Sequence, residues 1–181
     1  MLSRDQAYEI LKELTKSPSL LRHARSVSIV MEALAKHFGE DEEKFVVTGL
    51  LHDADYEKYP DQHPNVIVKR LQEMGEADIA HAIAGHYTHW NVPRVSMLDK
   101  CIVAADEITG FIIAAAQIRP TKLEGMDVQS VMKKFKTKNF AATVDREEVQ
   151  KGADLLGWEL SQLIAFIIPV LYENREMLEL A

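Results

Sequence analysis

The sequence predicts an all-α protein, and three observations support this prediction. Apolar residues recur at helical spacing along most of the 181 residues, whereas strand-like alternation bounded by turns is hard to find. Helix-capping residues precede several of the periodic segments. With 47% hydrophobic and 27% charged residues, the composition is that of an ordinary globular protein. We therefore expect a compact helical bundle.

Helix-start signals precede three periodic segments in the first third of the chain. They are a capping-box pair at Ser3 and Gln6, an N-cap followed by an N1 proline at Ser17 and Pro18, and a capping residue at Asp41. Gly39 is expected to stop the second helix. The three helices should extend to about residues 16, 38 and 53.

The rest of the chain follows the same helical pattern after one interruption. Residues 55–60 are polar, contain a proline and are expected to form a loop. Further helices are predicted over residues 62–74, 76–87, 95–117, 127–137, 145–156 and 159–179. Residues 119–126 mark only a weak boundary, so we expect a single domain, residues 1–181, in which the helices of 127–179 are added to the same core.

Charge and cysteine content restrict the expected partners and compartment. A net charge of -7 repels phosphate backbones and anionic membranes, so neither nucleic acid nor a membrane is an expected partner. The only cysteine, Cys101, cannot form an internal disulfide and is expected to be a small buried helix residue. The N-terminus lacks a secretory signal, and the apolar run at 163–172 is shorter than the ~20 residues of a membrane span. We expect a cytoplasmic protein, and the sequence does not indicate its oligomeric state.

Polar residues on apolar helix faces mark a candidate site. His23 shares the core-facing stripe of its helix with Val27 and Val30, a position where a lone histidine is usually a hydrogen-bonded core residue. His52 and Asp53 both follow Gly49, which has no side chain to crowd them.

Helix geometry and burial limit how His52, Asp53 and Asp106 can serve the candidate site. Adjacent helical residues project about 100° apart, so His52 and Asp53 can share one site if the helix ends beside them. The polar segment after Asp53 predicts such an end. Asp106 lies on an apolar helix face, where a bare carboxylate is costly and a bound cation would remove the cost.

The order of these residues resembles a known family. His23, an LLHD segment that ends at Asp53, and a second apolar helix that carries Asp106 resemble the HD superfamily of metal-dependent phosphohydrolases. The similarity spans roughly residues 20–117. It implies an HD-type helical bundle with a metal-binding core at about 18–117, and Asp53 and Asp106 as its catalytic carboxylates.

Two further histidines extend the resemblance to small bacterial members such as the HD-class diadenosine tetraphosphatases. His63 and His86 occur between the HD pair and the final aspartate, as in those proteins. The resemblance implies two metals bridged by Asp53. The first would also be held by His23, His52 and Asp106, and the second by His63 and His86.

Lys58 and His89 are candidate substrate contacts. Lys58 and Asp55 follow the HD pair closely enough to reach its substrate, and Lys58 could hold a phosphate as a point charge. The alternative interpretation, that this segment is only a solvated polar turn, is equally well supported. His89 shares a helical face with His86 if the helix continues, and is otherwise an exposed loop histidine.

The predicted chemistry is that of a metal-activated water. Imidazole and carboxylate ligands suit one or two divalent transition metals, namely manganese, iron, cobalt, nickel or zinc. Such ions activate water for attack on a phosphoryl group. The resemblance therefore implies hydrolysis of a small phosphate ester or anhydride, with a nucleotide as the expected substrate. Two alternatives stay open: an HD-fold di-iron oxygenase, which would consume oxygen, and a non-catalytic metal-stabilised ligand-binding module, which would hold metal without turnover.

Overall fold

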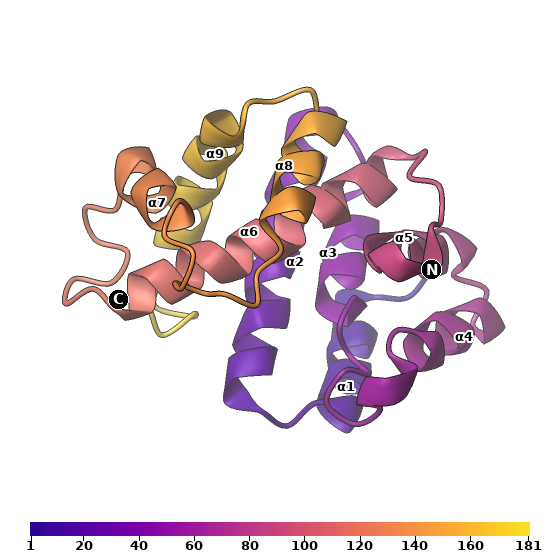
Figure 1. Ribbon diagram of the computed structural model, residues 1–181. Coiled ribbons are helices and arrows are strands. Elements are labelled where there is room, and N and C mark those ends of the chain that lie inside the picture. Colours follow the sequence, from indigo (N-terminus) through magenta and orange to yellow (C-terminus); the bar gives the residue numbers. More distant parts are fainter. The chain divides into compact units, whose positions relative to one another are not determined.

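A computed structural model describes all residues, 1–181, and confirms the all-α prediction (Figure 1). The chain forms helices only, with no strand. The α-helices are α1 Arg4–Leu14, α2 Pro18–Phe38, α3 Glu42–Leu51, α4 Asn65–Glu73, α5 Ala77–His86, α6 Met97–Gln117, α7 Val128–Phe135, α8 Arg146–Leu155 and α9 Leu160–Glu173. Two short 3-10 helices are η1 Pro60–Gln62 and η2 Thr88–Trp90.

The predicted helix-start signals are found at the observed helix ends. Ser3 and Gln6 form the capping box of α1, and the Asp41 side chain accepts the backbone N–H of Lys44 at the start of α3. Gly39 ends α2 with a φ of 72°, in the left-handed region that favours glycine. Ser17 occupies the N-cap of α2, but its side chain makes no capping hydrogen bond.

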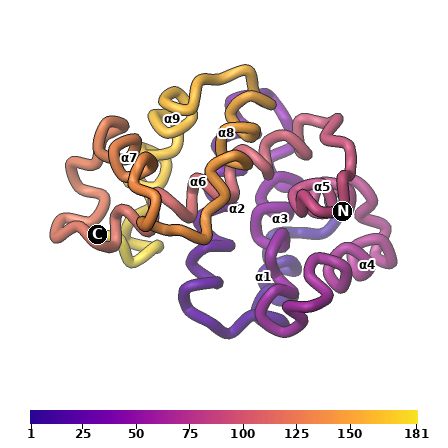
Figure 2. Tube along the Cα trace, in the orientation of Figure 1, coloured from indigo at the N-terminus to yellow at the C-terminus, as the bar shows by residue number.

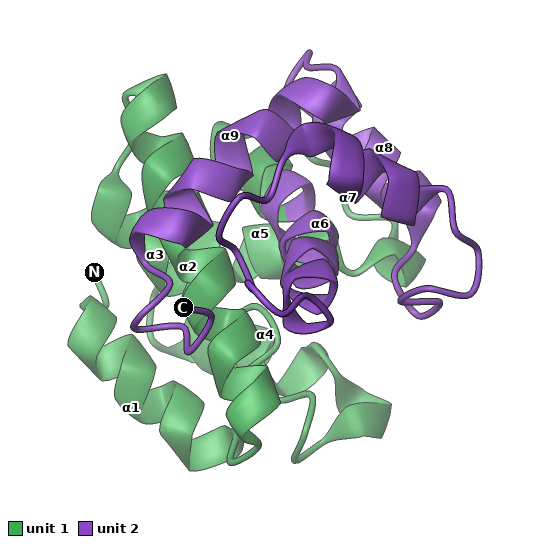
Figure 3. Ribbon diagram, turned by 90° about the vertical axis from the view of Figure 1, so that its left-hand side faces the viewer, with its two compact units in different colours: residues 1–102 green, residues 103–181 purple.

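The chain divides into two compact units, residues 1–102 and 103–181 (Figure 3). Helix α6 begins in unit 1 and ends in unit 2. In unit 1, α3 packs against α1, α2 and α5, and α4 packs against α5. The apolar face predicted around His23 is buried, and its core residues are Val27, Val30, Met31 and Leu34.

Gly49 has a different role from the one that the sequence suggested. A Cβ atom at this position would lie 2.5 Å from the Cα of Ser28 and 2.8 Å from its backbone nitrogen. Glycine is therefore required for α3 to approach the backbone of α2. The expectation that Gly49 leaves room for the site side chains is replaced by this close helix packing.

Helix α3 ends earlier than predicted, at Leu51 rather than Asp53. His52 is its C-cap, and its Nδ1 donates to the Gly49 carbonyl oxygen at 2.8 Å. From there the backbone continues through turns to η1 and then to α4. Figure 2 traces the chain between the labelled α3 and α4. Because the helix stops here, the adjacent residues His52 and Asp53 need not point about 100° apart.

The polar segment between α3 and α4 is anchored to the helices before it. The hydroxyl of Thr15 donates to the Ala54 carbonyl oxygen at 2.9 Å. The carboxylate of Glu57 accepts the backbone N–H groups of Lys16 and Ser17 at 2.8 and 2.9 Å. These contacts hold the segment against the junction of α1 and α2.

Unit 2 contains the packed helices α7, α8 and α9. Both α7 and α8 contact α9, which carries Pro169 inside the helix and buries an apolar face of Leu163, Ile164, Ile167 and Leu171. No single helix of the chain is both long and apolar enough to cross a membrane; α8 and α9 taken together, with a 91° bend between them, reach the required length and composition.

Candidate metal centre

Four imidazole rings surround the carboxylate of Asp53 in unit 1. Its Oδ2 lies 3.7 Å from Nε2 of His23 and 3.5 Å from Nε2 of His52. Its Oδ1 lies 3.3 Å from Nε2 of His63 and 3.4 Å from Nε2 of His86. The two oxygens of one carboxylate thus face two separate pairs of histidines.

The distances within each pair suit a common cation. The Nε2 atoms of His23 and His52 are 3.1 Å apart. One ligand atom each from Asp53, His63 and His86 lie within 4.8 Å of one another. Ligand atoms about 2.1 Å from a shared ion are themselves roughly 3 to 3.4 Å apart, so little movement would be needed to bind one.

The hydrogen-bond partners of His52 and His86 indicate which ring nitrogen carries a proton. Nδ1 of His52 lies 2.8 Å from the Gly49 carbonyl oxygen, and Nδ1 of His86 lies 2.5 Å from the Ile83 carbonyl oxygen. A carbonyl oxygen only accepts, so each Nδ1 carries a proton, and in the neutral form of each ring Nε2 presents a lone pair. These lone pairs face the carboxylate of Asp53. Acceptors that face one another in this way are stabilised by a cation placed between them, so the donor set fits a metal ion.

Asp55 orients the ring of His63, a role that the sequence did not predict. Its side chain is fully buried, with Oδ1 accepting Nδ1 of His63 at 2.6 Å and Oδ2 accepting the backbone N–H of Ile67 at 2.9 Å. The sequence had suggested that Asp55 could reach a substrate, or that it belonged to a solvated turn. The structure contradicts both readings, because the carboxylate is enclosed between His63 and the first turn of α4. In the sequence the only available signal was a second aspartate two residues after Asp53.

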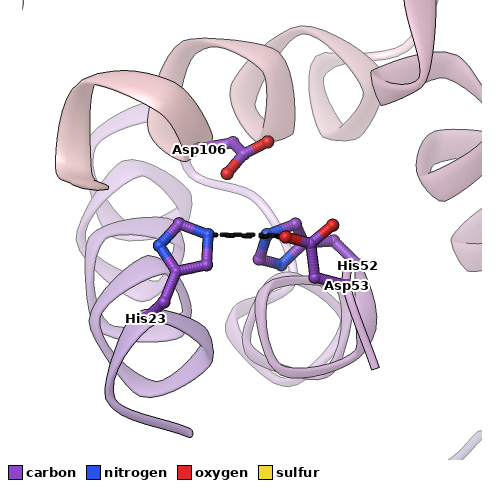
Figure 4. A group of neighbouring side chains, drawn as sticks. All are labelled: His23, His52, Asp53 and Asp106. Atoms are coloured by element: carbon purple, nitrogen blue, oxygen red, sulfur yellow. Dashed lines mark hydrogen bonds and ion pairs between the residues drawn. The ribbon is translucent and has the colours of Figure 1, made fainter. Parts of the chain in front are cut away.

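Asp106 lies on α6 within unit 2. Figure 4 draws its side chain together with those of His23, His52 and Asp53. These are the residues of the sequence pattern. The ligand role of Asp106 stays a prediction.

The two predicted substrate contacts do not belong to either ligand group. The ammonium of exposed Lys58 lies 5.4 Å from the centre of the Tyr59 ring. His89 is exposed in η2, and its ring centre is 5.2 Å from that of Tyr87. Helix α5 ends at His86, so His89 does not share a helix face with it. The roles of Lys58 and His89 in substrate binding stay predictions.

Other ionisable groups of unit 1 lie outside the metal centre. A cavity of about 480 Å³ is lined in part by Lys44, Asp78, His81 and Asp99, and by none of the residues around Asp53. Nδ1 of His81 is 3.1 Å from the Asp99 carboxylate. Cys101 is fully buried, as expected, and burial raises the pKa of its thiol to about 12, which excludes it as a nucleophile near neutral pH.

Comparison with known proteins identifies the family of the chain. The sequence profile of the HD domain matches residues 20–111, a segment that contains every predicted metal ligand. Ribonuclease Y of Oleidesulfovibrio alaskensis is 34% identical over 98 residues, and Ribonuclease Y of Lactobacillus helveticus is 33% identical over 95. These matches cover 52% and 50% of this chain but only 18% and 17% of the relatives. No solved structure matches the chain significantly. The HD domain match covers half of the chain, which therefore belongs to the HD domain family, whose members are generally metal-dependent phosphohydrolases.

Proposed function

We propose that this chain hydrolyses a small phosphate ester or anhydride, with a nucleotide as its substrate, by means of two divalent metal ions. Asp53 would bridge the ions. The other ligands would be His23, His52 and Asp106 for the first ion, and His63 and His86 for the second. The observation that supports this proposal best is the Asp53 carboxylate, which has one imidazole pair at each of its oxygens.

The chain's own residues prepare this site for cations. The hydrogen bonds from Nδ1 of His52, His63 and His86 hold the rings with Nε2 toward Asp53. Mixed nitrogen and carboxylate donors favour manganese, iron, cobalt, nickel or zinc. Divalent ions held there would supply an acidified water and neutralise charge on a phosphoryl group. No protein nucleophile is required for such a hydrolysis.

A small substrate agrees better with the charge of the chain than a polymer does. A net charge of -7 opposes binding of a long polyanion, whereas a mononucleotide or dinucleotide carries few phosphates. RNA hydrolysis is the second candidate function because the relatives carry the name Ribonuclease Y. The chain spans less than a fifth of those proteins, so this name describes much longer molecules.

Metal analysis combined with a substrate panel tests the proposal. The panel contains nucleoside monophosphates, diadenosine tetraphosphate, ribose 5-phosphate and a short single-stranded RNA, each tested with manganese, iron, cobalt, nickel and zinc. We expect about two metals per chain and turnover of a nucleotide. Cleavage of the RNA alone would favour the ribonuclease. Oxygen uptake by an iron-loaded protein would favour the oxygenase, and bound metal without any turnover would favour a binding module.

Asp106→Asn separates the role of this carboxylate in catalysis from a role in folding. The amide nearly preserves the volume but removes the negative charge that a cationic site needs. We expect activity to fall at least about a hundredfold while circular dichroism remains that of a helical protein. Asp61→Asn, at an exposed position outside both ligand groups, is the control. Parental activity in Asp106→Asn would mean that Asp106 is a structural residue of α6.

A further inference from the structure

Aromatic rings extend from the candidate metal centre to the surface of unit 1. The centres of the Tyr56 and Tyr87 rings lie 5.5 and 5.6 Å from that of His63, and both rings are nearly perpendicular to it. His63 is itself within 3.3 Å of the Asp53 carboxylate. Tyr56 and Tyr87 are therefore separated from the proposed second metal only by one of its ligands.

A tryptophan continues this row of rings outward. The Trp90 ring centre is 5.9 Å from that of Tyr87, with an angle of 84° between the rings. Trp90 is 38% exposed and Tyr56 is 49% exposed, so both present aromatic surface to solvent. We call Tyr56, Tyr87 and Trp90 the aromatic rim.

The position of the aromatic rim limits what it can bind. Single exposed aromatic residues need no explanation, but a row of three beside one polar site, two of them exposed, offers apolar ring surface next to it. The faces of nucleobases stack on aromatic side chains, and stacking tolerates any base because each has a π-face. A sugar phosphate has no such face, and its hydroxyl groups would need polar partners that the rim supplies only in two phenol groups and an indole N–H.

We infer that the aromatic rim is a base-binding subsite, so that the substrate is a nucleoside phosphate rather than a sugar phosphate. This inference rests on the proposed function, because it takes the phosphate to lie at the metals. The base then stacks on Trp90, and exposed Tyr56 supplies a second aromatic surface of the subsite.

Tryptophan fluorescence tests base binding without measuring turnover. The chain has two tryptophans, so Trp158→Phe leaves Trp90 as the only reporter, and Trp90→Phe is the matched control that leaves Trp158. We expect adenosine 5′-monophosphate to quench the Trp158→Phe protein in the presence of manganese. Ribose 5-phosphate should leave its emission unchanged, and Trp90→Phe should respond to neither compound. Equal quenching of both variants by the nucleotide, or none in Trp158→Phe, would overturn the inference.

Kinetics then distinguish failure of this inference from failure of the proposed function. Trp90→Leu and Tyr56→Leu should each raise KM for the hydrolysed nucleotide roughly tenfold, as expected for loss of a stacked base, with kcat nearly unchanged. Val95→Ala, at an exposed apolar position of the same unit, should change neither. Equal kcat/KM for nucleotide and ribose 5-phosphate, unaffected by Trp90→Leu, would remove the base subsite and leave the phosphohydrolase intact. Absence of hydrolysis of every phosphate compound would remove the proposed function, whereas the fluorescence result would still decide base binding.

Discussion

The two histidine pairs around Asp53 are built in different ways. His23 lies on α2 and His52 lies at the end of α3. These two helices approach closely where Gly49 meets Ser28. The 3.1 Å separation of their Nε2 atoms is therefore a consequence of helix packing in the core. Such packing is stiff, because a close-packed core transmits any change in volume to its neighbours.

In the second pair only one histidine belongs to an α-helix. His63 follows η1 outside any α-helix, and its ring is held by the buried carboxylate of Asp55. His86 is the last residue of α5 and is held by the carbonyl oxygen of Ile83. Because His63 lies outside any α-helix, whereas His23 lies within α2 and His52 caps α3, we expect the His63 side to lose its metal first.

The largest expected effect is that of removing the residue common to both pairs. Asp53→Ala should lower bound metal to less than about a tenth of the parental content, because both ions lose a ligand and the charge between them. Elemental analysis after dialysis measures this directly, with Asp61→Asn as the control. Two metals per chain in Asp53→Ala would exclude the bridging arrangement.

Removing one histidine from each pair should show the difference between the two sides. His63→Ala and His52→Ala should each retain about one metal per chain. The retained ion should lie on the His52 side in His63→Ala and on the His63 side in His52→Ala. In the parental protein, stepwise chelation should release one metal before the other, and His63→Ala should lack the early-released fraction. If His52→Ala lacks that fraction instead, the order of stability proposed for the two sides is reversed.

A smaller effect is expected from the residue that orients His63. Both oxygens of Asp55 accept hydrogen bonds, so the amide of Asp55→Asn would turn a donor toward either His63 or Ile67. Loss of a carboxylate partner behind a metal-binding histidine typically weakens affinity about 10- to 100-fold. Calorimetric titration with zinc should show this loss in one of two binding steps. Equal weakening of both steps would indicate a general structural defect, and Asp61→Asn should show neither.

The helix contact behind the first pair predicts an effect on stability. In Gly49→Ala the new Cβ would meet backbone atoms of Ser28, which cannot move independently of α2. We expect a loss of roughly 1 to 3 kcal/mol in the free energy of unfolding, measured by urea denaturation. Gly85→Ala is the control, because a Cβ there meets no atom closer than 3.9 Å. A Gly49→Ala protein as stable as the parent would show that α2 and α3 are packed more loosely than described.

Local signals explain why much of the fold was predictable. The capping box at Ser3, the left-handed end at Gly39 and the cap at Asp41 depend on residues within one turn of each helix end. Helical periodicity likewise involves neighbours three or four positions apart. The sequence pattern placed the end of α3 two residues too late. Helical periodicity does not reveal the hydrogen bond from the His52 ring to the Gly49 carbonyl oxygen.

The sequence by itself determined the all-α class, the family and the candidate ligand types, because these follow from short-range patterns and residue order. Only the tertiary structure decided which ring nitrogens face Asp53, that Asp55 supports His63, and that Gly49 is needed for helix packing. It also revealed the aromatic rim beside His63. The physical reason is the same in each case: these features depend on the direction of side chains and on the approach of segments distant in the chain, and neither is encoded by spacing along one helix.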